Sequence, residues 1–254
     1  MDGQISEKPD YGNWTPKLMI YVPLTIALLF LASSLKWSFL LIPATFFMLI
    51  AAFLFYVRFK LSPKAGNVQE SIWSFVIEHL DWSGEGRALD IGCGNGALTI
   101  KLAQKYRKAQ VLGIDYWGKR WDYSMSVCER NAAIEGVSDR VAFQRASAAS
   151  LPFADGYFDA AVSNFVFHEV GGVKDKRDVI REGLRVLKKG GRFAFQDEFL
   201  IKKMYGHPDA LITTIKSWGI AKVEFIETRE LPFIPRLLKA PFILGTMAMI
   251  RGEK

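Results

Sequence analysis

Cysteine and histidine are scarce in this 254-residue chain, which contains two cysteines and three histidines. Two cysteines do not provide the disulfide framework of a small secreted domain. They also do not provide the cysteine and histidine cluster of a structural zinc site, and we predict no metal. Cys93 lies in a glycine-rich segment and Cys128 in a predicted helix. We interpret both as small buried residues in a reducing compartment.

Charged residues are missing from two long stretches near the N-terminus. The first runs from Leu18 to Leu35 and the second from Phe39 to Val57. Each has close to the roughly 20 residues that a helix needs to cross a bilayer. Because only residues 36–38 separate them, the pattern predicts a transmembrane helical hairpin. A hairpin that enters the membrane without crossing it, or one buried in a soluble protein, is the alternative.

The formal net charge is +7, but the basic residues are scattered among acids, and we predict no nucleic-acid partner. The flanks of the hairpin are basic. Two lysines precede it and Arg58, Lys60 and Lys64 follow it, whereas only Lys36 lies at its tip. Because basic residues favour the cytoplasmic side of a membrane, we expect an integral membrane protein whose larger part faces the cytoplasm.

The chain divides into four predicted parts. They are a polar tail (1–17), the hairpin (18–59), a linker (60–70) and an α/β domain (71–254). Within the domain, we expect strands at Ala88–Ile91, Val111–Ile114, Val141–Gln144, Phe158–Ser163 and Arg192–Gln196. Predicted helices alternate with these strands, which is typical of a parallel sheet with helices on both faces.

The first predicted strand runs into a glycine-rich turn. Gly92, Gly94 and Gly96 precede a helix, and glycines in this position let the backbone approach a ligand closely. Asp115 lies about twenty residues further, at the end of the second strand, where a carboxylate can accept hydrogen bonds from ribose hydroxyls. Tyr116 follows it and offers a ring that can pack on adenine. These features alone also fit a dinucleotide such as NAD.

Four segments together resemble the class I S-adenosylmethionine-dependent methyltransferases. Residues 89–96, with Asp90 ahead of the glycines, resemble motif I of that family. Residues 151–159, 164–168 and 184–192 resemble its later motifs, in the same order. A dehydrogenase is not expected to share these three. The resemblance implies a Rossmann-like seven-stranded sheet, in which residues 245–252 form a seventh strand antiparallel beside the fifth.

The resemblance also implies a cofactor, S-adenosyl-L-methionine, and a role for each matching residue. Asp90 and the three glycines would hold the methionine part, with Asn164 beside it, and Asp115 would hold the ribose. Ser147 and Ala148 stand where many members bind adenine. Many of those members have an aspartate at the position of Ser147, and this difference weakens the expected adenine contact.

Methyl transfer requires a general base only if the acceptor must lose a proton. The candidates at predicted carboxyl ends of strands are His168, Glu169, Asp197 and Glu198. We place His168 and Glu169 in the catalytic site, with His168 first because imidazole titrates near neutrality. Lining the pocket or capping a helix is the alternative role for His168.

Residues 231–244 are very apolar and contain three prolines and two basic residues, which disfavours a regular strand or helix. We expect an interfacial lid whose apolar side chains enter lipid and whose basic side chains meet headgroups. The apolar set is Phe233, Ile234, Leu237 and Leu238, and the basic set is Arg236 and Lys239.

These features predict a membrane-anchored methyltransferase that acts on a small lipophilic acceptor. The acceptor classes we consider are a quinone precursor, a lipid, and a hydrophobic thiol or phenol. The alternatives are a membrane-anchored NAD-type dehydrogenase and a non-catalytic cofactor-binding membrane module.

Overall fold

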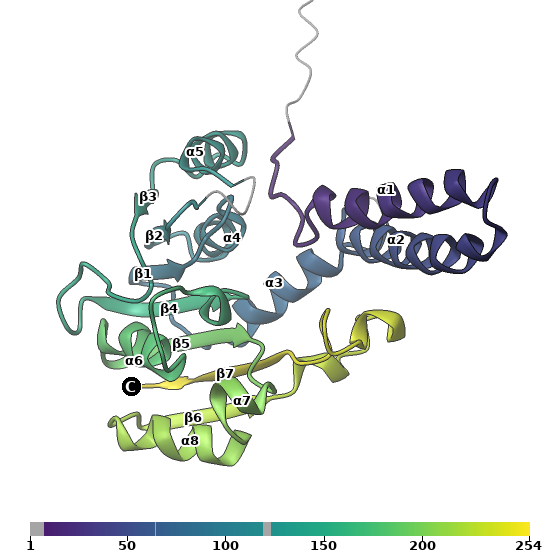
Figure 1. The fold of residues 1–254 in the computed structure, drawn as a ribbon. Helices are drawn as coiled ribbons and strands as arrows, with labels where there is room; N and C mark the ends of the chain where they lie inside the picture. Colours follow the sequence, from purple (N-terminus) through teal and green to yellow (C-terminus); the bar gives the residue numbers. More distant parts are fainter. Residues whose placement is uncertain (1–7, 64, 119–122) are drawn as a thin grey trace, which may run out of the picture. The chain divides into compact units, whose positions relative to one another are not determined.

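The computed structural model describes residues 8–63, 65–118 and 123–254. The chain forms two compact units (Figure 1). One unit is Gly12–Ser71, and the other combines residues 8–11 with Ile72–Lys254. The predicted basic flank residue Lys64 lies outside the described residues.

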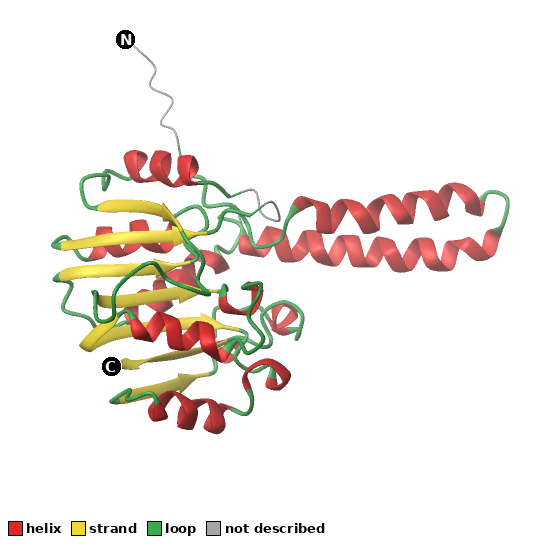
Figure 2. Cartoon of the chain, turned by 60° about the vertical axis from the view of Figure 1, so that its left-hand side comes forward, coloured by secondary structure: helices red, strands yellow, loops and turns green. Residues whose placement is uncertain are grey.

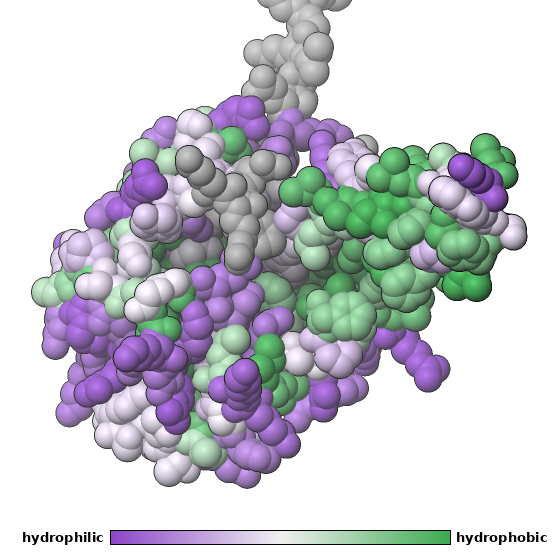
Figure 3. All heavy atoms as spheres, in the orientation of Figure 1, coloured by the Kyte–Doolittle hydropathy of each residue, from purple (hydrophilic) through white to green (hydrophobic). Residues whose placement is uncertain are grey.

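The smaller unit is a helical hairpin. Helix α1 (Lys17–Ser34) is followed by a short 3-10 turn (Ser38–Leu40) and by α2 (Leu41–Leu61). Both helices are long and apolar enough to cross a membrane by length and composition. Few of their residues are buried, and the face of the hairpin seen in Figure 3 is mostly hydrophobic. The buried positions include Ala27, Ala44 and Ala51, whose small side chains let the two helices approach closely.

The predicted linker at residues 60–70 is shorter in the structure. Helix α2 continues to Leu61, and α3 (Val68–Glu78) begins seven residues later. The two ends of the hairpin are joined by hydrogen bonds: the Asn13 amide donates to the Arg58 carbonyl at 3.0 Å, and the Arg58 guanidinium donates to the Thr15 carbonyl. Arg58 therefore holds the segment before α1 against the last turns of α2.

The larger unit contains a seven-stranded sheet. Its strands are β1 (Gly86–Ile91), β2 (Ala109–Asp115), β3 (Val141–Arg145), β4 (Phe158–Asn164), β5 (Leu187–Asp197), β6 (Lys222–Ile226) and β7 (Ala248–Glu253). Their order across the sheet is β3-β2-β1-β4-β5-β7-β6. The first five strands are parallel, and β7 runs antiparallel to both neighbours. The predicted seventh strand beside the fifth is confirmed.

Helices cover both faces of this sheet (Figure 2). They are α3, α4 (Ala97–Lys105), α5 (Met125–Ile134), α6 (Arg177–Arg185), α7 (Lys202–Tyr205) and α8 (Pro208–Ser217). The central strand β4 is almost entirely buried, and its neighbour β1 is buried from Ala88 to Ile91, as expected for parallel strands that are covered on both sides. The core gathers aromatic side chains such as Phe158, Phe193 and Phe195, each 1% exposed or less.

Residues 231–247, between β6 and β7, lack regular helices and strands apart from a 3-10 turn at Arg236–Lys239. The prediction that Ile234 and Leu238 face lipid is wrong, because they are 3% and 0% exposed and belong to the core. Leu237 and Phe242 are 58% and 74% exposed. The segment thus presents two large apolar side chains outward while it anchors itself by two others.

Candidate functional site

The glycine-rich turn lies at the carboxyl end of β1. Gly92, Gly94 and Gly96 have φ angles of +76°, +57° and +85°, the left-handed region that favours glycine. A Cβ atom added to Gly92 would lie 2.3 Å from the Cγ2 atom of Val166. The backbone amides of Gly92 and Cys93 both donate to the carbonyl of Ile114, at 2.8 and 2.9 Å. The turn therefore exposes backbone without side chains at its glycines, and hydrogen bonds to β2 hold it in place.

Asp90 is fully buried beneath this turn. Its Oδ2 atom accepts a hydrogen bond from the Thr99 hydroxyl at 2.7 Å, whereas its Oδ1 atom has no partner among the residues that the structure describes. Burial raises the pKa of Asp90 to about 7, against the opposing effect of the Thr99 hydrogen bonds. A buried carboxylate with a spare acceptor is a suitable partner for a cationic ligand group such as an ammonium.

The raised pKa of Asp90 makes a prediction about stability without cofactor. Because the folded value lies above the unfolded value of about 3.9, ionisation of Asp90 weakens the fold as the pH rises from about 4 to 7. Asp90→Asn removes this penalty. The difference in free energy of unfolding between Asp90→Asn and wild type should therefore increase by about 2.5 kcal/mol between pH 5 and pH 8, measured by urea denaturation. A pH-independent difference would contradict the raised pKa.

Asp115 ends β2 and faces the glycine-rich turn. Its Oδ2 atom accepts from the Gly94 amide at 2.9 Å, and its Oδ1 atom accepts from the Trp117 amide at 2.8 Å. The Trp117 indole donates to the Gly94 carbonyl at 2.9 Å. Burial raises the pKa of Asp115, partly offset by its backbone hydrogen bonds. The carboxylate is thus held beside the turn, as its predicted ribose-binding role requires.

The other predicted cofactor residues lie at or next to the ends of β2, β3 and β4. Tyr116 is 63% exposed, and the Arg145 guanidinium lies 5.1 Å from its ring centre. The Ser147 hydroxyl accepts from the Ala149 amide at 3.2 Å, and Ala148 packs against the core. The side-chain oxygen of the buried Asn164 accepts from the side-chain amide of Gln196 at 3.1 Å. These positions agree with a cofactor site along this edge of the sheet.

His168 and Glu169 follow β4 in a short 3-10 turn (Phe167–Glu169). The Nδ1 atom of His168 lies 2.8 Å from Oδ1 of Asp197, at the end of β5. Its Nε2 atom lies 4.0 Å from Oε1 of Glu169. Burial of the ring would lower the pKa of His168, but the charge and hydrogen bond of Asp197, helped by Glu198 and Glu169, raise it overall. His168 is therefore surrounded by the other three predicted base candidates, which are Glu169, Asp197 and Glu198.

Two buried asparagines near the turn were missed from the sequence. The Asn131 side chain, in α5, accepts from the backbone N–H of Asp10 and donates to the Asp10 carbonyl, both at 2.9 Å. It also donates to the Asn95 carbonyl at 3.0 Å. The Asn95 side chain also donates to the Asp10 carbonyl, at 3.1 Å. Residue 10 was assigned to a polar tail, yet it is bound to the glycine-rich turn. No local pattern signals a pairing between residues 121 positions apart.

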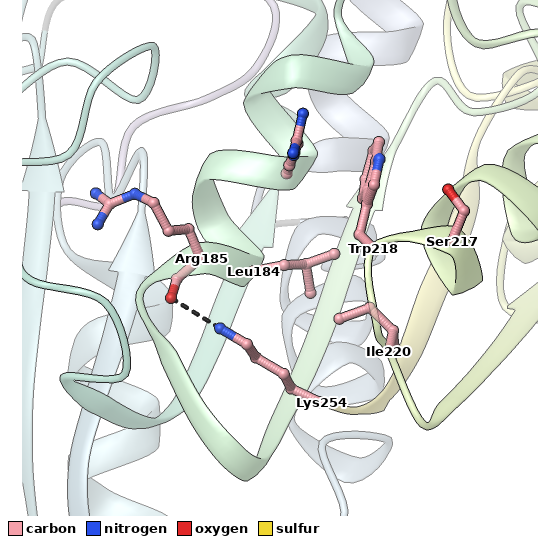
Figure 4. Close-up of a pocket in the computed structure, with 7 residues that line it drawn as sticks. Leu184, Arg185, Ser217, Trp218, Ile220 and Lys254 are labelled. Carbon is pink, nitrogen blue, oxygen red and sulfur yellow. Dashed lines mark hydrogen bonds between the residues drawn. The ribbon is translucent and has the colours of Figure 1, made fainter.

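A cavity of about 340 Å³ lies elsewhere in the domain (Figure 4). It is lined by Arg181, Leu184, Arg185, Ser217, Trp218, Ile220 and Lys254. The Lys254 amino group donates to the Arg185 carbonyl at 2.8 Å, and the Arg185 side chain points away from the cavity (Figure 4). Because β7 is antiparallel to β5, Lys254 lies near the start of β5, opposite the end that carries Asp197. This cavity is separate from the predicted cofactor site.

The sheet order and the glycine-rich turn agree with the resemblance to class I S-adenosylmethionine-dependent methyltransferases. Residues 89–195 match a family model described as "Methyltransferase domain". The left-handed glycines, the buried acceptor of Asp90 and the position of Asp115 fit S-adenosylmethionine, which is the cofactor of this domain. The matches favour this cofactor over the NAD that the glycines alone would allow.

Several curated relatives are methyltransferases by name. The chain is 36% identical over 124 residues to "Methyltransferase GfsG" from Streptomyces halstedii, covering 48% of this chain and 41% of that protein. It is 28% identical over 127 residues to the "Ubiquinone/menaquinone biosynthesis C-methyltransferase UbiE" of Geotalea daltonii, covering 50% and 51%. The chain spans about half the length of these relatives or less.

Solved structures share the fold. A geranyl diphosphate methyltransferase in complex with S-adenosylmethionine has a TM-score of 0.56 at 16% identity, covering 75% of this chain and 87% of that chain. The "[4+2]-Cyclase SpnF" has a TM-score of 0.55 at 23% identity, covering 74% and 81%. One of these neighbours is named for a reaction other than methyl transfer, so the fold alone does not define the chemistry.

Proposed function

We propose that this protein is a membrane-anchored methyltransferase that transfers a methyl group from S-adenosylmethionine to a small lipophilic acceptor at the cytoplasmic face of a membrane. The observation that carries the proposal is the combination of a candidate cofactor site and an apolar helical hairpin in one chain. The site consists of the left-handed glycines with Asp90 and Asp115. The hairpin exposes apolar side chains along both of its helices.

The bound cofactor supplies a methyl group on a sulfonium, which is a good leaving group. The protein then has to align the acceptor with that methyl group and exclude water. The glycine-rich turn and Asp115 provide backbone and carboxylate contacts for alignment. The buried edge around Phe167 and Asn164 limits the access of water.

The exposed part of residues 231–247 supports an acceptor that is drawn from lipid. Leu237 and Phe242 point outward, and the exposed Arg236 directly precedes Leu237. Apolar side chains next to a basic one suit the interface of a bilayer. Lys239 is paired with Glu230 at 3.5 Å, so headgroup contact falls mainly to Arg236. A relative from Lactiplantibacillus plantarum, 29% identical over 150 residues, is named "Demethylmenaquinone methyltransferase", which supports a lipophilic acceptor class.

The test uses the full-length protein in liposomes and cofactor with a labelled methyl group. The acceptors are 4-dodecylphenol and 1-dodecanethiol, compared with water-soluble phenol and 2-mercaptoethanol. We expect transfer to one dodecyl acceptor at least about tenfold faster than to its soluble counterpart, because partition into the bilayer raises its local concentration. Replacing both Leu237 and Phe242 by Gln should lower only the dodecyl rates. The matched control, Met125→Gln, changes another exposed apolar residue and should leave them unchanged.

Each other outcome contradicts part of the proposal. Equal rates on both kinds of acceptor would contradict the lipophilic class. Cofactor binding without transfer to any acceptor would favour a non-catalytic membrane module. Thermal stabilisation by NADH and not by S-adenosylmethionine would favour a dehydrogenase.

A further inference from the structure

We propose that His168 acts through Nε2 as the general base of methyl transfer, that Asp197 positions it, and that the acceptor group is therefore a phenolic or enolic hydroxyl. The inference rests on the proposed function and deepens it, because it selects the reacting group. Oxygen acceptors of this kind are weak nucleophiles until they lose a proton, so they need a base. A thiol, which ionises more readily, depends on a base far less.

The geometry around Asp197 carries the assignment. Its Oδ2 atom accepts from the amides of Val166 and Phe167 at 2.9 and 2.7 Å. Its Oδ1 atom accepts from the Glu198 amide at 2.7 Å and from the Tyr205 hydroxyl at 3.3 Å. Three backbone N–H groups and one hydroxyl donate to the two oxygens of this fully buried side chain, so both oxygens act as acceptors. Nδ1 of His168 is therefore the donor in the 2.8 Å contact with Oδ1.

That donor role fixes the tautomer of the imidazole. With hydrogen on Nδ1, the neutral ring carries its lone pair on Nε2, which is where a base must accept a proton. The Phe165 ring packs edge-on against the imidazole, with centroids 5.0 Å apart, and the His168 side chain is 15% exposed. Packing and hydrogen bonding together hold the ring in one orientation, as an efficient general base requires.

The position of His168 suits a reaction at the cofactor. Val166, two residues earlier, is the residue whose side chain lies against the glycine-rich turn at Gly92. Both segments follow the carboxyl ends of neighbouring parallel strands, β1 and β4, where ligands bind in sheets of this type. The base and the methyl donor would therefore share one edge of the sheet.

The charges around His168 are acidic. Asp197 approaches it from the end of β5, Glu198 from the next residue along the chain, and Glu169 from its own turn. The Tyr205 hydroxyl, from α7, contacts Asp197. Burial alone would lower the pKa of His168, but these carboxylates raise it above its usual value. A raised pKa makes the neutral imidazole a stronger base. The protonated ring cannot accept a proton, so the rate should fall as the pH decreases through this pKa.

The proposed step balances without an oxidant or a metal. The O–H bond of the acceptor breaks and its proton goes to Nε2 of His168, while an oxygen electron pair forms the new O–CH₃ bond. The electrons of the broken S–CH₃ bond stay on sulfur, which becomes a neutral thioether. The imidazolium then releases its proton to solvent.

The first experiment measures the His168–Asp197 pair directly, without turnover. The full-length protein with ¹³C-labelled histidine has three imidazole signals, and His168→Gln assigns one of them by NMR. We expect the pKa of His168 to lie above about 6.5 in wild type and in Tyr205→Phe, and to fall by about one unit or more in Asp197→Asn. Binding of S-adenosylmethionine confirms that each variant is folded. If the pKa of His168 is the same in Asp197→Asn and in wild type, Asp197 does not pair with His168 and the proposal is contradicted.

The second experiment measures methyl transfer to 4-dodecylphenol and to 1-dodecanethiol in liposomes. His168→Gln should lower kcat with the phenol by about 100-fold or more, with KM and cofactor affinity unchanged, and remove the decline of the rate below the His168 pKa. Its kcat with the thiol should change less than about threefold if the thiol reacts at all. The control His207→Gln, at an exposed histidine, should match wild type.

The outcomes separate this inference from the proposed function. An equal loss with both acceptors would show a structural role for His168 and overturn the assignment as a base. Transfer to the thiol alone in wild type would overturn the hydroxyl class. If S-adenosylmethionine binds but neither acceptor is methylated, the proposed function fails, and the NMR titration still decides whether Asp197 positions His168.

Discussion

Asp115→Ala should lower the affinity for S-adenosylmethionine by about 100-fold or more. A carboxylate at the end of β2 can accept hydrogen bonds from both ribose hydroxyls, and a bond to a charged group contributes about 1.5–3 kcal/mol. Two such bonds correspond to a factor of at least about 100. The Gly94 amide also loses the acceptor that holds it at 2.9 Å. Calorimetric titration of the full-length protein in detergent measures the effect.

Two further variants make this experiment decisive. Asp115→Asn keeps an oxygen for Gly94 but loses the charge, so its affinity should lie between those of wild type and Asp115→Ala. Asp139→Ala removes a carboxylate whose side chain is 72% exposed, and its affinity should stay within about twofold of wild type. If Asp115→Ala binds S-adenosylmethionine as tightly as wild type, Asp115 does not bind the ribose, and the roles assigned to Tyr116 and Ser147 are also wrong.

Gly92→Ala should destabilise the protein by about 2–5 kcal/mol. A residue with a Cβ atom pays roughly 1–2 kcal/mol for the left-handed conformation, and Gly92 has a φ of +76°. The new methyl group would also lie 2.3 Å from the Val166 side chain, and such overpacking typically costs about 1–3 kcal/mol. We expect a drop in Tm of roughly 5–15 °C, measured by scanning fluorimetry of the full-length protein.

The two causes can be separated by matched variants. Gly136→Ala has a similar φ of +67° but open space around the new methyl group, so it should show only the backbone cost. Adding Val166→Ala to Gly92→Ala removes the steric conflict and should recover much of the difference between the two glycine variants. If Gly92→Ala and Gly136→Ala melt at the same temperature, the close contact with Val166 does not exist.

The parts of the fold that sequence reasoning predicted depend on local patterns. Each of the five predicted parallel strands is found, because apolar runs bounded by turn residues are visible within a short window. The glycine-rich turn and Asp115 were placed correctly at strand ends for the same reason. The antiparallel seventh strand followed from resemblance to a family and not from periodicity.

The parts that were missed depend on contacts between distant residues. The fifth strand was predicted to begin at Arg192, but β5 begins at Leu187, which pairs with Phe158 across the sheet. In residues 231–247, every apolar side chain looked equally suited to lipid, and only the packing of the domain decides that Ile234 and Leu238 are buried. The positioning role of Asp197 likewise depends on strands that meet only in the folded sheet.

The pairing of Asp10 with Asn131 means that the hairpin is an insertion within the larger unit, which contains the residues that match the methyltransferase model. The chain leaves the domain after Tyr11 and rejoins it at Ile72, and these points are close, since the rings of Tyr11 and Trp73 are 5.9 Å apart. A shortened protein that starts at Ile72 would therefore lose a piece of its own cofactor-binding domain. Excising residues 12–71 and joining the two points with a short flexible linker keeps that piece. A form of the protein without the hairpin should be engineered by this second route.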